Sequence, residues 1–305
     1  MNYSNLGNIS DVPPAVLSFP SMMTLEEKAL LFHLARDVFS GAGVIVDAGL
    51  FLGASTHAFC HGLRAGGRAT QKVVHAYDIA IWSKAGFDKY LGNPAVLEKL
   101  GSRSYSDGES YQPLLEDLLS EHDDLVDLRI GDIVNEIRTD RPVEIAFFDL
   151  LKNGTRDWAV FKTLGPHYIA GKTIIVQQDY FYEDALENKI RQEYLSPYFE
   201  FLGAFGSSGV FKLIKELPSH MFEKDVLESL PTSEKFRLLK QAVNRIPVSK
   251  FQMYASLGVI RFLILNNQKA EARSELDQLD RVMMDSKHTS PRARQIADLI
   301  RVNLS

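Results

Sequence analysis

Two glycines and the polar residues around them have types and a spacing that suit a ligand site. In the stretch VIVDAGLFLGASTHAFC, Gly49 and Gly53 stand four residues apart, with Asp47 before them and Ser55 and Thr56 after. Glycine lets the backbone turn tightly and lets a ligand approach without a Cβ in the way. Free amides at the start of a following helix can bind an anionic or polar group. The stretch therefore predicts either an ordinary turn between a strand and a helix or a cradle for a nucleotide-like ligand.

Further acidic residues stand where other strands are expected to end. Asp78 closes the run KVVHAYD, Asp132 follows LRIG, and Asp149 follows VEIAFF. The carboxylate of Asp78, at the end of the second expected strand, can accept hydrogen bonds from the hydroxyls of a ribose. Because ligands of parallel α/β sheets bind beyond the carboxyl ends of the strands, these carboxylates are expected to meet at one edge. Each of them alone is equally explained as a solvated loop residue.

The glycine spacing separates the candidate ligands. A dinucleotide fingerprint requires G-x-G-x-x-G and an ATP phosphate loop requires G-x-x-x-x-G-K-[ST]. This chain has G-x-x-x-G at Gly49 and Gly53. The spacing therefore disfavours an NAD(P)-dependent oxidoreductase and an ATP phosphate loop.

The elements that must position these residues alternate along the chain. Apolar, β-branched runs bounded by glycine and aspartate predict strands, and segments of helical spacing stand between them, which indicates a parallel sheet covered on both faces. The run YFEFLGAFGSSGVFKLIKEL predicts an antiparallel hairpin. Residues 218–305 show helical spacing without strand signals. We expect an irregular lead-in over 1–21, an α/β domain over 22–217 and a helical region over 218–305 for lid, docking or dimer contacts.

Composition and charge exclude several classes of protein. The 305 residues are 45% hydrophobic and 24% charged, as in an ordinary globular protein. A net charge of −5 provides no broad basic field for nucleic acid. The single cysteine, Cys60, rules out an intrachain disulfide and a cysteine metal cluster. Without a signal-peptide pattern or an apolar run of roughly 18–20 residues, we expect a cytoplasmic protein with no membrane partner.

The ordered set of motifs resembles one enzyme family. VDAGLFLGAST resembles the D/E-x-G-x-x-x-G-x-S/T signature of class I S-adenosylmethionine-dependent methyltransferases, and VVHAYD, LRIGDI and VEIAFFDLLKN resemble their second, third and fourth strand segments. The resemblance covers roughly residues 22–217. It implies a Rossmann-like methyltransferase fold, with a mostly parallel seven-stranded sheet that closes in an antiparallel hairpin, and S-adenosylmethionine as the cofactor.

The resemblance also implies a role for each matched position. Gly49 and Gly53 would line the amino-acid part of the cofactor, Ser55 or Thr56 would lie near its carboxylate, and Asp78 would hold its ribose. The other implied cofactor contacts are Asp47 and Phe51 in the glycine stretch and, at the adenine, Asp132 and Ile133.

Catalysis in similar small-molecule O-methyltransferases often uses a divalent ion. The catechol-type enzymes place an Asp and, three residues later, a Lys base at the fourth strand, and Asp149 and Lys152 take the matching places here. Lys152 is equally read as a solvated loop lysine. Gln178 stands where the family has its first metal-binding Asp, and Asp179 takes the next position. The resemblance thus implies a Mg²⁺ site of reduced charge at Asp149, Gln178 and Asp179.

Two functions from different classes follow. The first is a methyltransferase, O-directed, acting on a small molecule or a sugar. The second is a methyltransferase-like binding or scaffold protein without catalysis, which the QQDY strand end and the added helices suggest. The helical region is expected to support a homodimer. His57, at the start of a helix, is interpreted as a structural residue.

Overall fold

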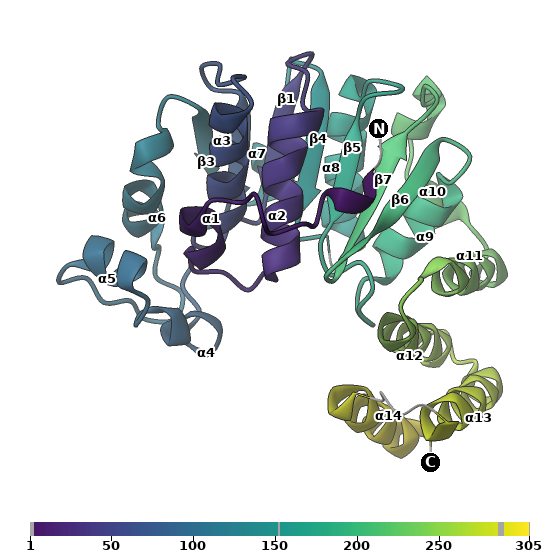
Figure 1. The fold of residues 1–305 in the computed structure, drawn as a ribbon. Helices are drawn as coiled ribbons and strands as arrows, with labels where there is room; N and C mark the ends of the chain where they lie inside the picture. Colours follow the sequence, from purple (N-terminus) through teal and green to yellow (C-terminus); the bar gives the residue numbers. More distant parts are fainter. Residues whose placement is uncertain (1–2, 152, 286–289, 305) are drawn as a thin grey trace.

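A seven-stranded sheet in the order β3-β2-β1-β4-β5-β7-β6 forms the centre of the molecule (Figure 1). The computed structural model describes residues 3–151, 153–285 and 290–304. Strands β1 to β5 pair in parallel, while β7 pairs antiparallel with β5 and β6. The strands are β1 Val44–Ala48, β2 Val74–Asp78, β3 Val126–Ile130, β4 Val143–Phe148, β5 Ile174–Gln177, β6 Phe199–Phe205 and β7 Ser208–Leu213. The mostly parallel sheet and the closing hairpin are confirmed.

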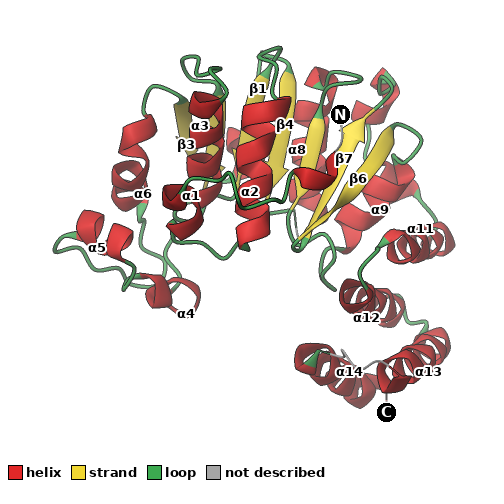
Figure 2. Ribbon diagram, in the orientation of Figure 1, coloured by secondary structure: helices red, strands yellow, loops and turns green. Residues whose placement is uncertain are grey.

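Helices cover both faces of this sheet, as the alternation predicted (Figure 2). Helices α2, α3 and α6 pack on one face, and α7, α8 and α9 on the other. Side chains alternate along a strand, so Ile45 belongs to the first hydrophobic cluster while Val44 and Val46 belong to the second. The α-helices of this domain are α1 Pro14–Ser18, α2 Leu25–His33, α3 Ala54–Ala65, α4 Lys84–Phe87, α5 Pro94–Leu100, α6 Gln112–Leu119, α7 Ile133–Glu136, α8 Gly154–Leu164 and α9 Leu186–Tyr194.

Local signals in the sequence place the ends of the helices that carry the site. Thr24 and Glu27 form a capping box at α2: the Glu27 amide donates to Thr24 Oγ1 at 3.2 Å, and the Thr24 amide donates to Glu27 at 2.8 Å. Helix α3 ends at Ala65, and Gly66 is its C-cap residue. Helix α9 is missed by the sequence prediction because its buried positions are polar, so its apolar stripe is too narrow to read: Asn188, Lys189, Arg191, Gln192 and Glu193.

The region after the hairpin is helical, as predicted, and packs on α9. Leu186 and Ile190 of α9 form a buried cluster with Leu238, Leu239 and, further along, Val259. Its helices are α10 Val226–Ser229, α11 Thr232–Arg245, α12 Ser249–Leu265, α13 Lys269–Asp285 and α14 Pro291–Leu304. The last three extend away from the sheet (Figure 1). Within the part of the chain that the structure describes, no helix has both the length and the apolar character needed to cross a membrane.

Candidate functional site

A pocket of about 260 Å³ opens beyond the carboxyl ends of β1, β2, β3 and β4. It lies where the strand order turns, since β2 follows on one side of β1 and β4 on the other. Four residues that the sequence placed at strand ends, Gly49, Asp78, Asp132 and Asp149, line this one pocket, so their convergence is confirmed. The remaining lining residues are Met22, Phe51, Tyr77, Ile79, Ile81, Phe87, Tyr111, Gly131, Ile133, Leu150 and Arg156.

The loop from Gly49 to Gly53 has left-handed backbone at three positions. The φ angles are 92° at Gly49, 53° at Phe51 and 89° at Gly53, and only glycine adopts such values freely. A Cβ at Gly49 would lie 3.1 Å from the backbone of Asp149, so glycine also lets the ends of β1 and β4 approach. A Cβ at Gly53 would lie 2.8 Å from the side chain of Leu119. Gly53 therefore faces α6, whereas Gly49 faces the pocket.

The Asp78 carboxylate holds this loop in place. Its Oδ2 accepts hydrogen bonds from the amides of Leu50 at 2.7 Å and Phe51 at 2.9 Å, and its Oδ1 accepts from the amide of Ala80 at 2.7 Å. The Tyr111 hydroxyl lies 3.2 Å from Oδ1 and 3.0 Å from the carbonyl oxygen of Phe51, and its single proton serves one of them at a time. Burial raises the pKa of Asp78, and the three amides oppose that rise. The Oδ1 atom of Asp78 thus accepts the Tyr111 proton only part of the time, and it can accept a hydrogen bond from a ligand hydroxyl.

Asp47 and Thr56 lie beneath the loop, outside the pocket lining. The Thr56 hydroxyl donates to Asp47 Oδ2 at 2.6 Å, which ties the first turn of α3 to β1. Asp47 is fully buried, and burial raises its pKa from 3.8 to about 7. Both residues position the glycine loop from below.

A small hollow of about 10 Å³ adjoins the pocket and shares Met22, Gly49, Phe51 and Asp149 with it. Ser55 lines this hollow. Its other lining residues are Ser21, Met23, Leu50, Ala54, Phe147 and Gln178. The hollow has room for about one water molecule, so a ligand would extend from the pocket towards the start of α3 only if Met22 moved aside.

The structure brings together two of the three residues of the predicted metal set. Asp149 and Gln178 line the small hollow. Asp179 has a φ of 57°. Its Oδ1 lies 3.1 Å from the hydroxyl of Ser207 in the hairpin turn, and the single proton of that hydroxyl is shared with Glu27 at 2.8 Å. Lys152, predicted as a base, lies outside the described residues.

The β3 side of the pocket is apolar apart from one capping carboxylate. Asp132 begins α7, where its side chain accepts from the Val134 amide at 3.1 Å. Ile133 is buried, and together with Ile79 and Ile81 it gives this wall its apolar surface.

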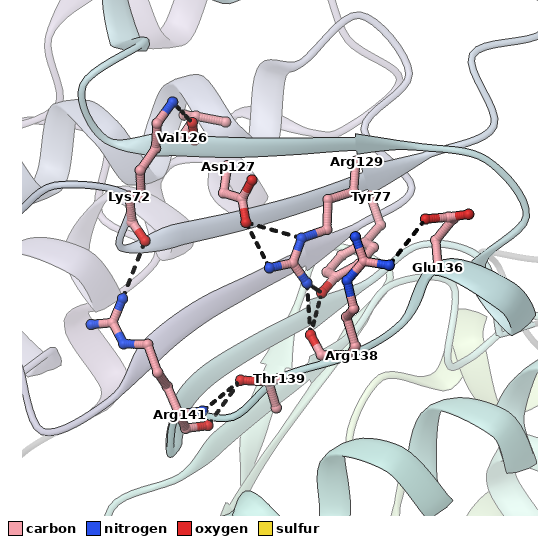
Figure 3. A network of polar contacts seen from close by, with 9 residues as sticks. All are labelled: Lys72, Tyr77, Val126, Asp127, Arg129, Glu136, Arg138, Thr139 and Arg141. Carbon is pink, nitrogen blue, oxygen red and sulfur yellow. Dashed lines mark hydrogen bonds and ion pairs between the residues drawn. The ribbon is translucent and has the colours of Figure 1, made fainter.

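Several residues that line the pocket were missed by the sequence prediction, and Tyr77 is one of them. A network of polar contacts holds the Tyr77 side chain (Figure 3). The Tyr77 hydroxyl donates to the Arg138 carbonyl at 2.8 Å, and the Arg129 guanidinium lies 5.2 Å from the Tyr77 ring. Asp127 accepts from Arg129 at 2.6 Å and 2.9 Å. The other missed residues are Met22, Ile79, Ile81, Phe87, Tyr111, Gly131, Leu150 and Arg156. Met22, Phe87, Tyr111 and Arg156 stand in segments without a motif, so only their place beside the strand ends identifies them.

Trp82, Cys60 and Tyr180 belong to the core. They are 1%, 0% and 2% exposed, and none of them lines the pocket or the hollow.

Comparisons with known proteins find similarity to solved structures but no match by sequence. No protein-family model matches the chain, and no curated protein matches its sequence. A solved structure of the O-methyltransferase NovP superposes with a TM-score of 0.46 and 18% identity, over 64% of this chain and 82% of its own. The strand order and the antiparallel β7 are those of a methyltransferase-like α/β fold.

Proposed function

We propose that this chain is an S-adenosylmethionine-dependent methyltransferase that methylates an oxygen of a small molecule or sugar. The observation that supports the proposal is the pocket at the ends of four parallel strands, which joins the glycine loop, Asp78 and an apolar wall. The sequence resemblance assigns the same positions to the cofactor.

The residues present fit the nucleoside part of that cofactor. Ile79, Ile81 and Ile133 offer an apolar surface to a nucleobase, and the partly used acceptor position of Asp78 suits one ribose hydroxyl. The pocket of about 260 Å³ is smaller than the roughly 300–1,000 Å³ of typical ligand sites. The amino-acid part would extend past Gly49 to Ser55, and this requires Met22 to move aside.

Asp149 is our candidate for proton removal. The cofactor supplies an activated methyl group, and an attacking alcohol must be aligned with it and must lose a proton. Asp149 lines both the pocket and the small hollow. Asp149 would accept that proton or, with the oxygen of Gln178, contribute to a Mg²⁺ site as in the predicted set with Asp179. Arg156, on the pocket rim, would orient an acceptor that carries negative charge.

Binding of S-adenosylhomocysteine tests the cofactor assignment. By isothermal titration, we expect the parent protein to bind one molecule of S-adenosylhomocysteine per chain. The variant Ile79→Glu should bind it at least about tenfold more weakly, because an unpaired carboxylate would face the nucleobase. Ile79 is 50% exposed, so the change leaves the core intact. Leu97→Glu is the matched control, since Leu97 is 54% exposed on α5 and does not line the pocket. Absence of binding by the intact protein would overturn the assignment.

A second candidate is a methyltransferase-like binding or scaffold protein, favoured by the amides that already occupy Asp78. A broad methyl-transfer screen separates the two candidates. If the parent protein methylates an acceptor and the variant Asp149→Asn does not, the result supports the enzyme. Retained S-adenosylhomocysteine binding without turnover supports the binding protein. A cytoplasmic location and a homodimer through the C-terminal helices complete the proposal.

A further inference from the structure

Three histidines and a glutamate converge between α3 and the end of α6, on the outer side of the helix that follows the glycine loop. His57 and His61 stand one turn apart on α3, so their side chains share a face. Glu121 and His122 belong to the 3₁₀ turn Ser120–His122, which directly follows α6. One ligand atom from each of the four side chains lies within 4.8 Å of all the others.

Three of the four ligand atoms have distances close to those in a metal-binding tetrahedron. His57 Nδ1 lies 3.0 Å from His122 Nε2, and Glu121 Oε1 lies 3.3 Å from the first nitrogen and 3.5 Å from the second. Zinc bonds of about 2.0–2.1 Å place neighbouring ligand atoms roughly 3.3–3.4 Å apart. The His61 ring completes the group, with its centroid 4.4 Å from that of His57 and 5.4 Å from that of His122.

The hydrogen bonds among the described residues leave this group incompletely satisfied. A hydrogen bond between His57 and His122 uses one proton, and Glu121 Oε1 approaches the same two nitrogens. His61 Nε2 is buried and has no hydrogen-bond partner among the described residues. Buried polar atoms without partners are rare in native proteins, and a bound ion is one way in which such an atom is satisfied.

Neighbouring side chains hold the ligands in place. The ring of Phe19 stacks on His57 with centroids 4.3 Å apart. Arg64 donates to the backbone carbonyl of Glu121 at 3.1 Å and so holds the 3₁₀ turn. Glu121 is 59% exposed and gives an ion a path from solvent.

We propose that His57, His61, Glu121 and His122 form a structural Zn²⁺ site that clamps α3 to the end of α6. Imidazole suits zinc, and four protein ligands close the site, as in structural rather than catalytic centres. Both clamped elements adjoin the candidate site: Ala54 and Ser55 of α3 line the small hollow, and Tyr111, the residue before α6, lines the pocket. The ion would fix these two helices relative to each other beside the site. This proposal does not depend on methyl transfer.

Metal analysis of tag-free protein tests the site. After purification in zinc-containing medium, we expect one zinc per chain by inductively coupled plasma mass spectrometry. Titration of the chelated and desalted protein with ZnCl₂ is expected to give one site, and zinc is expected to raise the melting temperature. MgCl₂ is expected to give neither effect, because magnesium prefers oxygen ligands.

Two variants and a control make the test specific. His61→Gln and Glu121→Gln each remove one ligand from a partly exposed position, so we expect folded proteins by circular dichroism and at least about 100-fold weaker zinc binding. His167→Gln changes a half-buried histidine outside the cluster and is expected to bind zinc like the parent protein. The proposal would be overturned if both ligand variants bound zinc as tightly as the parent protein, or if His167→Gln lost as much zinc affinity as they do. The cluster would then be a hydrogen-bonded histidine pair.

Discussion

At the scale of single residues, the candidate site depends on carboxylates that do different work. Asp78 accepts backbone amides of the glycine loop, Asp149 borders the ligand space, and Asp47 is buried beneath both. Sequence position alone makes the three look alike, since each stands at or near a strand end. Their hydrogen-bond partners and their burial separate the residue that shapes the loop from the one that can meet a substrate.

The buried Asp47 predicts a pH dependence of stability. Its pKa is raised from 3.8 to about 7 by burial, so the folded chain holds this proton in a range where the unfolded chain has lost it. Its contribution is complete below about pH 4 and is lost as the pH rises through about 7, which amounts to up to about 4 kcal/mol. In Asp47→Asn this loss is absent. Relative to the parent, the free energy of unfolding of the variant should rise by about 2–3 kcal/mol between about pH 5 and pH 8, measured by urea unfolding.

Asp140→Asn is the control for this experiment, because Asp140 is exposed. Its pH profile should follow that of the parent protein. A parallel profile for Asp47→Asn as well would contradict the raised pKa of Asp47.

At the scale of elements, a buried charge network fastens the sheet domain to the helical region. Arg191 of α9 donates to Asp157 of α8 at 2.5 Å and to Asp225, just before α10, at 3.1 Å and 3.2 Å. The side chains of Arg191 and Asp157 are each 4% exposed. Removal of one member of a buried ion pair leaves an uncompensated charge and costs about 3–5 kcal/mol.

Arg191→Gln should therefore lower the free energy of unfolding by about 3–5 kcal/mol at about pH 8, measured by chemical denaturation. The loss should be smaller at about pH 5, because the pKa of Asp157 is already raised to about 6 by burial and its carboxyl can take up a proton. Arg237→Gln, which breaks an exposed pair with Glu234 within α11, should cause no measurable change. Equal effects of the two substitutions would show that the buried network does not stabilise the fold.

At the scale of the whole molecule, the C-terminal helices present an apolar groove of about 400 Å³ between α12 and α14. Leu265 and Leu299 line it and are 73% and 61% exposed. Exposed apolar residues that gather on one face are typical of protein contacts. We expect a homodimer in light scattering that the double substitution Leu265→Glu and Leu299→Glu converts to a monomer, while Leu97→Glu on α5 leaves it unchanged. A parent protein that is monomeric at high concentration would contradict this expectation.

The order of the elements and the positions of the strand ends follow from local patterns in the sequence. The strand runs of β1 and β4 are buried throughout, so their apolar, β-branched residues could be read without knowledge of their partners. The hairpin turn and the capping box of Thr24 and Glu27 are likewise local patterns. For that reason the resemblance to the methyltransferase fold and the convergence of Gly49, Asp78, Asp132 and Asp149 were predictable.

The tertiary structure decided what depends on residues far apart in the chain. Tyr111 reaches Asp78 across 33 positions, and His122 reaches His57 across 65, so neither the partly used ribose position nor the histidine cluster has a local pattern. Helix α9 escaped prediction because its buried charges are matched by partners on other elements, and the sequence shows only its polarity. Periodicity records which side of an element is buried, whereas the contacts that satisfy a buried polar atom exist only once the chain has folded.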